Sequence, residues 1–128
     1  KKKLPILVVC VGMQIMASKS EEGILPGLNW IEGKVLKFSN EIILPHMGWN
    51  NIKPLINSNL FTEIINPKFY FLHSYYYETN DEKHSISVTN YGNNFISAIN
   101  KKNIYGTQFH PEKSHENGIK ILKNFINI

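Results

Sequence analysis

Two stretches decide the fold and the chemistry of this chain: Val8-Val9-Cys10-Val11-Gly12-Met13-Gln14 near its start, and Gly106-Thr107-Gln108-Phe109-His110-Pro111-Glu112-Lys113-Ser114 near its end. The first stretch holds the one cysteine of the chain, and the second holds a histidine and a glutamate two residues apart. These three residue types make up a thiol nucleophile, its general base and the group that orients the base. The sequence therefore predicts a Cys-His-Glu site built from two distant segments.

The cysteine is expected at a sharp turn between a strand and a helix. Residues 4–9 are apolar and β-branched apart from Pro5, which predicts a short buried strand, and the apolar residues 11–17 predict the first turns of a helix. Gly12 removes a Cβ where helix and strand crowd together. This order is typical of a nucleophile elbow, and the helix N-terminus behind it predicts a lowered thiol pKa. The alternative is a buried structural cysteine, which is the commoner role of an isolated cysteine.

The histidine is expected at the end of a strand over residues 103–109. Pro111 follows it and prevents a helix from continuing. In an extended segment His110 and Glu112 would share a face, so that Glu112 accepts a hydrogen bond from one imidazole nitrogen while the other faces the thiolate. A surface His-x-Glu pair usually has no function. The strand end favours a site here, because ligand sites of α/β sheets form at such ends.

Five segments, taken in order, resemble class I (triad-type) glutamine amidotransferases, and most closely the glutaminase subunit of imidazole glycerol phosphate synthase. They are residues 10–14, 20–23, 45–50, 70–76 and 106–114. The first and last are shared by the whole class, whereas Pro-His-Met-Gly-Trp-Asn at 45–50 and His-Ser-Tyr-Tyr at 73–76 are more specific to this subunit. The resemblance implies an α/β fold, with a flavodoxin-like doubly wound sheet and an added antiparallel section. Residues 1–128 would form a single domain, the C-terminal two-thirds of the family domain.

The resemblance also implies a reaction and a partner. Cys10 would attack the side-chain amide of glutamine and release ammonia, and water would hydrolyse the thioester with His110 as acid and base and Glu112 orienting it. The implied substrate-binding residues are Gly12, Gln14, Glu22, Ser74 and Tyr75, and the implied partner interface and ammonia gate are Trp49, Tyr70 and Lys113. The partner would be a (β/α)₈ barrel subunit, in a heterodimer that makes imidazole glycerol phosphate for histidine biosynthesis. No cofactor is implied.

Two features depart from the family pattern. Val8 stands where the family has a glycine, and a β-branched side chain below the elbow is expected to distort it or to impede catalysis. The chain also begins almost at the nucleophile strand, whereas family members have further N-terminal strands and a glycine-rich loop that completes the oxyanion hole. A doubly wound sheet without its first strands would expose an apolar edge, so we expect a fragment.

The composition excludes several other classes of protein. The chain has 128 residues, 42% of them hydrophobic and 19% charged, which is ordinary for a globular domain. Its net charge is +4, but the lysines are scattered and arginine is absent, so we expect no nucleic-acid partner. No apolar run is long enough to span a membrane. One cysteine suits the reducing cytoplasm, and the histidines and cysteine are not spaced as zinc ligands, so no metal is expected.

The remaining pattern predicts the other elements. Strands are expected over residues 33–38, 68–77, 85–90 and 95–100, with the start of another at 42–44 ended by Pro45, and helices near 59–64 and over 118–126. His46 could be an interface residue or a buried structural one, and the structural role is expected. His73 is expected to lie near the site without acting as the base.

Three other functions stay open at this stage. The same glutaminase chemistry could feed a sugar amidation in surface-polysaccharide biosynthesis, a branch that residues 22–31 somewhat resemble. The chain could be an inactive module that binds a synthase, which Val8 and the unmatched N-terminal part of the family both favour. A hydrolase of γ-glutamyl peptides is weaker, because residues 45–50 point to a synthase interface.

Overall fold

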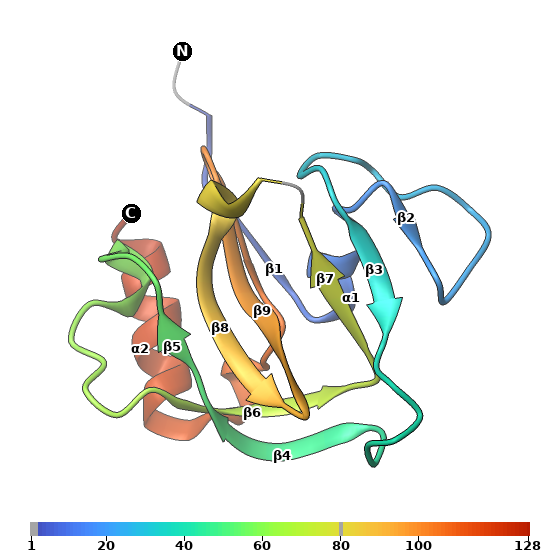
Figure 1. The fold of residues 1–128 in the computed structure, drawn as a ribbon. Helices are drawn as coiled ribbons and strands as arrows, with labels where there is room; N and C mark the ends of the chain where they lie inside the picture. Colours follow the sequence, from blue (N-terminus) through green and yellow to red (C-terminus); the bar gives the residue numbers. More distant parts are fainter. Residues whose placement is uncertain (1–2, 80) are drawn as a thin grey trace.

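An eight-stranded mixed sheet organises the described part of the chain, residues 3–79 and 81–128, in this computed structural model (Figure 1). Six strands lie in the order β1 (Ile6–Val9), β10 (Ile104–Thr107), β9 (Asn93–Lys101), β7 (Tyr75–Glu78), β3 (Lys34–Lys37) and β2 (Lys19–Ser20). β8 (Ser85–Tyr91) also pairs with β9, and β5 (Lys53–Pro54) pairs with β8. The predicted strands over 33–38, 85–90 and 95–100 are confirmed.

Two of the strand pairs are parallel and the others are antiparallel. β1 pairs with β10, and β2 with β3, in the parallel direction, whereas the pairings of β7, β8 and β9 are antiparallel. This mixture confirms the predicted α/β class with an antiparallel section. The parallel β1–β10 pair matters for the chemistry, because it brings the residues that follow both strands to the same end of the sheet.

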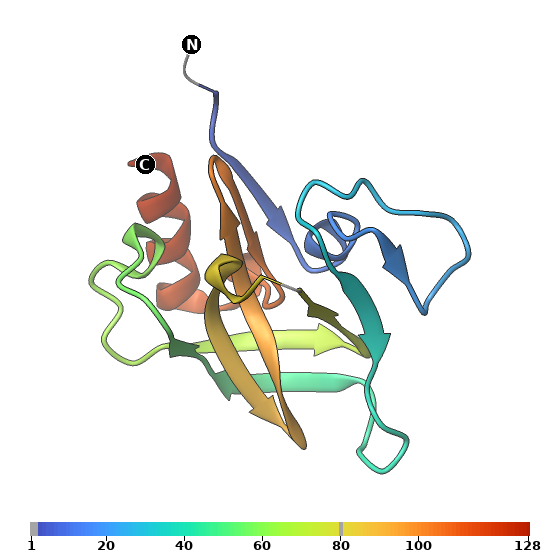
Figure 2. The ribbon, with the colours of Figure 1, turned by 45° about the horizontal axis from the view of Figure 1, so that its top comes forward.

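A separate two-stranded ribbon runs behind the β8–β9 hairpin in the view of Figure 2. It consists of β4 (His46–Asn51) and β6 (Lys68–His73), paired antiparallel so that Trp49 lies opposite Tyr70. Alternate residues of β6, namely Phe69, Phe71 and His73, are buried. Since side chains alternate along a strand, the aromatic run fills the core with one face only, as its period-two pattern predicts.

Few helices accompany these strands in residues 3–79 and 81–128. They are α1 (Val11–Gln14), α2 (His115–Ile126) and the 3₁₀ turns η1 (Asn59–Phe61), η2 (Glu82–His84) and η3 (Pro111–Lys113). Helix α2 buries Ile121 in the aromatic core. Its Gly118 lies so close to the preceding turn that an ideal Cβ there would be 1.8 Å from the carbonyl oxygen of Pro111. The backbone of α2 therefore packs directly on the segment that follows His110.

Four element predictions are corrected. The helix predicted over 11–17 ends at Gln14, because the carbonyls of Ile15 and Ala17 accept backbone N–H groups from residues 28 and 29 instead of continuing a helix. The strand predicted at 42–44 forms only after Pro45, where β4 finds its partner β6. The strand predicted over 68–77 breaks at Ser74, where the chain leaves β4 and joins β3 and β9. The last helix begins at His115, three residues earlier than predicted.

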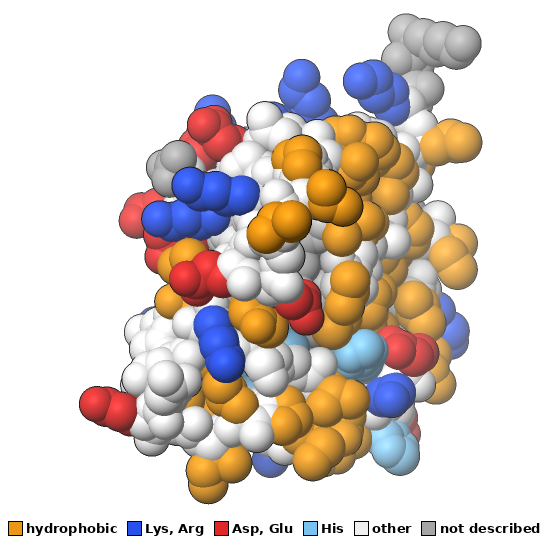
Figure 3. All heavy atoms as spheres, turned by 90° about the vertical axis from the view of Figure 1, so that its right-hand side faces the viewer, with side chains coloured by type: hydrophobic (Ala, Val, Ile, Leu, Met, Phe, Trp, Pro, Cys, Tyr) orange, Lys and Arg blue, Asp and Glu red, His pale blue; other side chains and the backbone are white. Residues whose placement is uncertain are grey.

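Hydrophobic side chains gather on the face shown in Figure 3, which is the side that carries α1, β2 and β3. The exposed large apolar residues of this part of the chain are Val11, Ile15, Ile24, Leu25, Leu28 and Trp30. Three of them, Val11, Ile15 and Leu25, also line a cavity described below. None of the described helices is both long and apolar enough to cross a bilayer.

Candidate active site

Cys10 occupies a strained turn between β1 and α1. Its φ of 53° and ψ of −108° are unusual for a residue with a Cβ, as expected for a nucleophile elbow. Its backbone N–H donates to the carbonyl of Thr107 at 2.7 Å, and its own carbonyl accepts from Gln14 N at 3.1 Å. Neighbouring elements on both sides therefore hold this backbone in place.

Val8 fits below the elbow. Its side chain packs beside the buried cluster that contains Met13, and an ideal Cβ on Gly12 would lie 3.4 Å from the Cβ of Val8. This is an ordinary contact distance. The turn at Cys10 thus forms with valine two residues before it.

The thiol of Cys10 is buried, and this changes its acidity. Burial raises its pKa above the ordinary value, and the charges of Glu112 and Glu22 raise it further, whereas hydrogen bonds from the Val11 N–H and the Gln108 amide lower it. The predicted net lowering of the thiol pKa is wrong. Helix α1 has only four residues, so its N-terminus is too weak a dipole to outweigh the loss of solvent.

His110 and Glu112 form a close pair. Nδ1 of His110 lies 2.8 Å from Oε2 of Glu112, so the imidazole N–H donates to the carboxylate. The other nitrogen, Nε2, is buried and has no hydrogen-bond partner among the described residues. The segment is not extended as predicted: Glu112 lies in η3, the 3₁₀ turn that starts after His110, and the turn itself brings the carboxylate back to the ring.

The backbone of His110 is fixed from two sides. Its N–H donates to Tyr70 O at 2.9 Å, and its carbonyl accepts from the hydroxyl of Ser114 at 2.6 Å. Since β1 and β10 are parallel neighbours, Cys10 and His110 follow their strands at one end of the sheet. The ring nitrogen left free by Glu112 therefore belongs to a residue at the same sheet end as the thiol, although it makes no hydrogen bond to the sulfur. The Sγ–H of Cys10 itself donates to Leu72 O at 3.6 Å.

A cavity of about 290 Å³ lies beside the elbow. It is lined by both Gln14 and Glu22, together with Lys19, Ser20 and the apolar residues of α1 and the following loop. Two of the expected substrate-binding residues are thus brought together. Gly12, Ser74 and Tyr75 do not line this cavity. Tyr75 meets the site through its backbone, because its carbonyl accepts from the Gln14 amide, whereas the Ser74 carbonyl accepts from Phe38 N in the core.

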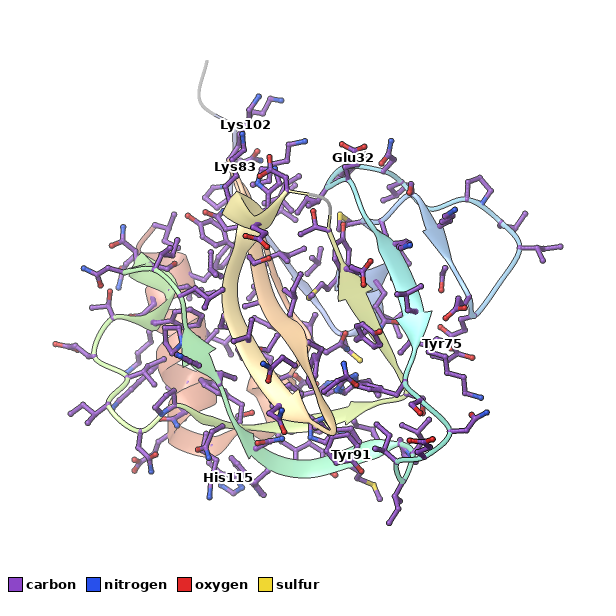
Figure 4. The ribbon with its side chains drawn as sticks, in the orientation of Figure 1. Glu32, Tyr75, Lys83, Tyr91, Lys102 and His115 are labelled. Carbon is purple, nitrogen blue, oxygen red and sulfur yellow. The ribbon has the colours of Figure 1, made fainter. Side chains whose placement is uncertain are left out.

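The three expected interface residues lie on the β4–β6 ribbon and on η3. The rings of Trp49 and Tyr70 meet edge to face with centroids 6.1 Å apart, and Trp49 also contacts His115, which Figure 4 labels at the start of α2. A second, more open cavity of about 560 Å³ is lined by Trp49, Lys68, Ser114, His115 and Lys120 among others. Lys113 is exposed on η3, next to this cavity's Ser114.

Sequence reasoning missed two buried polar contacts, one between Gln108 and Cys10 and one between His46 and His73. Gln108 is fully buried, and its amide donates to Sγ of Cys10 at 3.5 Å. His46 and His73 are joined at 2.9 Å between Nδ1 and Nε2, and burial lowers the pKa of each to about 4. The predicted burial of His46 is confirmed. No sequence pattern marked Gln108, which stands between Thr107 and Phe109 just after β10. Of the described His, Cys, Asp and Glu side chains, no three gather as metal ligands would.

Known proteins are similar to this chain over all or nearly all of its length. Residues 1–128 match the family model for glutamine amidotransferase class-I. The chain is 51% identical over 133 residues to the imidazole glycerol phosphate synthase subunit HisH of Leptospira borgpetersenii, covering 99% of this chain and 65% of that protein. It is 48% identical to the same subunit of Bdellovibrio bacteriovorus, covering 100% of this chain and 66% of that protein. The chain thus spans just under two thirds of the length of these relatives.

Solved structures agree on the fold. A Thermotoga maritima glutamine amidotransferase superposes with a TM-score of 0.65 at 14% identity, covering 96% of this chain and 47% of that one. A Thermoplasma acidophilum protein described as a candidate GMP synthase component superposes with a TM-score of 0.68 at 22% identity, covering 96% of this chain and 56% of that one. At such identities the likeness concerns the fold alone.

Proposed function

The chain belongs to the class-I glutamine amidotransferases, and we propose that it forms part of a glutaminase subunit that supplies ammonia to imidazole glycerol phosphate synthase in histidine biosynthesis. The observation that carries the proposal is the arrangement of His110. One ring nitrogen is held by Glu112, and the other is buried and free at the sheet end that carries Cys10. A base that is oriented on one side and unoccupied on the other is what a cysteine nucleophile requires.

The proposed reaction has two halves. The sulfur of Cys10 attacks the side-chain carbonyl carbon of glutamine, Nε2 of His110 takes the thiol proton, and the same proton leaves with the amide nitrogen as ammonia. Water then attacks the thioester while His110 accepts a proton from it, and the thiol is restored as glutamate leaves. Burial raises the pKa of the Cys10 thiol, so the neutral thiol is favoured and a base is needed to take its proton.

The cavity beside the elbow supports glutamine as the substrate. Glu22 can accept from the α-ammonium group of an amino acid, and Lys19 can pair with its carboxylate. Gln14 lines the same cavity, and we propose that it binds substrate there together with Gly12 and the Ser74–Tyr75 segment.

The proposed partner is a (β/α)₈ barrel synthase subunit in a heterodimer. Trp49, Tyr70 and Lys113 would face it and form the gate for ammonia. Aromatic and basic side chains around an open cavity support this assignment, because aromatic residues are enriched in the cores of protein interfaces. The proposed place of action is the cytoplasm, which keeps an isolated thiol reduced. The similarity to histidine-pathway subunits favours this acceptor over a sugar amidation.

The test measures glutamate release with and without a histidine-pathway barrel subunit. Both the 128-residue chain and a version extended to the length of its relatives are assayed, each beside Cys10→Ala. We expect release that depends on the partner and is lost in Cys10→Ala. Equal release by Cys10→Ala would refute the nucleophile, and binding of the barrel without any release by either version would leave a binding module as the function.

A further inference from the structure

Two glutamine side chains form a hydrogen-bonded bridge that ends on the nucleophile. The amide nitrogen of Gln108 donates to Sγ of Cys10 at 3.5 Å, and the amide nitrogen of Gln14 donates to Oε1 of Gln108 at 3.0 Å. Gln108 is fully buried and Gln14 is nearly so. Buried amides in fixed contact with a thiol are rigid, because each unmade hydrogen bond would cost the desolvation of a polar group.

The carbonyl oxygen of Tyr75, at the end of the bridge away from the cysteine, determines which atoms donate and which accept in each of its hydrogen bonds. The carbonyl oxygen of Tyr75 can only accept, and Nε2 of Gln14 lies 3.0 Å from it, so that end of the Gln14 amide must be the nitrogen. Its second N–H then meets Gln108, whose nearer atom must be the oxygen. The nitrogen of Gln108 is left facing the sulfur. Figure 4 labels Tyr75 at the corner where β6 passes into β7, so this anchor belongs to the sheet rather than to a loose loop.

The same short segment carries the amide and the base. Gln108 and His110 are two residues apart after β10, with Phe109 between them packed in the aromatic core against Phe69. One stretch of chain therefore carries both the hydrogen-bond donor to the thiol and the proposed base.

We propose that Gln108 is a positioning residue for Cys10, whose amide N–H holds the sulfur in line for attack and stabilises it as a thiolate, while Gln14 keeps that amide from turning over. The inference rests on the proposed glutaminase function. It assigns Gln14 a second task besides substrate binding. An N–H aimed at a sulfur lowers the energy of the charged form more than that of the neutral thiol. The ionisable groups that also act on this thiol are Glu112 and Glu22, which oppose the charged form. His110 is its proposed proton acceptor.

The chain offers a direct readout, because Cys10 is its only cysteine. The rate of alkylation by iodoacetamide is measured against pH for the parent, Gln108→Met and Gln108→Glu. Methionine is similar in length and cannot donate, so we expect its apparent thiol pKa to rise by about one unit and its alkylation rate at neutral pH to fall about tenfold. Glutamate adds a negative charge, so its thiol pKa is expected to rise further. Glutamine turnover with the barrel partner should lose about tenfold or more in kcat with KM changed less than about threefold.

Thr89→Val is the matched control. Its hydroxyl is buried and lacks a hydrogen-bond partner in the described structure, and it lies on β8 outside the site, so removing it should leave the alkylation profile unchanged. If Gln108→Met fails to fold, Gln14→Met removes the group that orients Gln108 and should give a smaller shift in the same direction. Superimposable profiles for the parent and the glutamine variants would overturn the proposal. If the variants shift the alkylation profile but the parent never hydrolyses glutamine, the role of Gln108 at the thiol would be supported and the glutaminase function refuted.

Discussion

The backbone N–H of His110 donates to the carbonyl oxygen of Tyr70 across 2.9 Å. This bond attaches the proposed base to β6, the strand that also carries a proposed interface residue. The Ser114 hydroxyl connects the same two residues again, since it donates to the His110 carbonyl at 2.6 Å and accepts from Tyr70 N at 3.0 Å. A displacement of β6 by a partner would therefore reach the base through two hydrogen-bonded connections.

Ser114→Ala tests this connection. The serine is almost fully buried, and its loss leaves backbone groups of Tyr70 and His110 without that partner. We expect the free energy of unfolding in urea to fall by about 1–3 kcal/mol and kcat for glutamine to fall several-fold. Ser39→Ala is the control, because Ser39 caps only an exposed turn. An unchanged kcat in a folded Ser114→Ala protein would show that the base does not need this hydroxyl.

Glu112→Gln should separate thiol acidity from turnover. The pKa of Cys10 is raised first by burial and then in part by the charge of Glu112, so removing that charge should lower the thiol pKa and speed alkylation at neutral pH. Turnover should nevertheless fall at least about tenfold, because the protonated ring of His110 loses its carboxylate. Alkylation and glutamine hydrolysis are measured on the same samples. Slower alkylation in the variant would contradict the assignment of Glu112 as the neighbouring charge.

Stability should fall as the solution becomes acidic. The pKa values of His46 and His73 are lowered by burial to about 4, below the ordinary value of 6.5, so the unfolded chain binds more protons than the folded one between these limits. The contribution of each neutral histidine is complete above about pH 6.5 and is lost as pH falls toward 4, with a slope of up to about 1.4 kcal/mol per pH unit each. Urea unfolding from pH 7 to 4.5 measures it. His46→Gln should flatten the slope, and a slope equal to the parent's would count against this origin.

Gly118→Ala is expected to destabilise the protein, although replacing a helical glycine with alanine usually stabilises it. Alanine in a helix interior normally stabilises it by about 1 kcal/mol relative to glycine. Here the added Cβ would lie 1.8 Å from Pro111 O, so α2 or the turn after His110 must move. We expect a loss of about 2 kcal/mol or more and a lower thermal midpoint. Lys123→Ala, an exposed change on the same helix, should be nearly neutral, and a stabilised Gly118→Ala protein would disprove the close packing.

Val8→Gly tests whether valine impedes the elbow. Val8 packs beside the Met13 cluster, and the turn at Cys10 forms in its presence. Glycine should therefore cost about 1–2 kcal/mol in lost burial and strand rigidity while changing kcat less than about threefold. Chemical denaturation and glutaminase kinetics are compared with those of the parent. A tenfold gain in kcat would mean that the β-branched side chain does impede catalysis.

Sequence reasoning succeeded where local patterns determine the structure. The turn at Cys10 follows from an apolar strand, a glycine and a short helix, and the β8–β9 hairpin follows from alternation around Gly92. It failed where distant segments compete for the backbone, as at Ile15, whose carbonyl is taken by Leu28 N. It also failed for the thiol pKa, because the burial of Cys10 depends on residues far along the chain, such as Leu72. The role of Gln108 could not be predicted, because its contacts with Cys10 and Gln14 join residues far apart in the sequence.

The positive φ of Cys10 means that the residue needed for catalysis is not the one that would make the folded chain most stable at this position. A residue with a Cβ pays a conformational penalty in this region that glycine escapes. Laboratory evolution that selects only for thermal stability is thus expected to favour Cys10→Gly. The resulting protein would be more stable but would lack the proposed nucleophile.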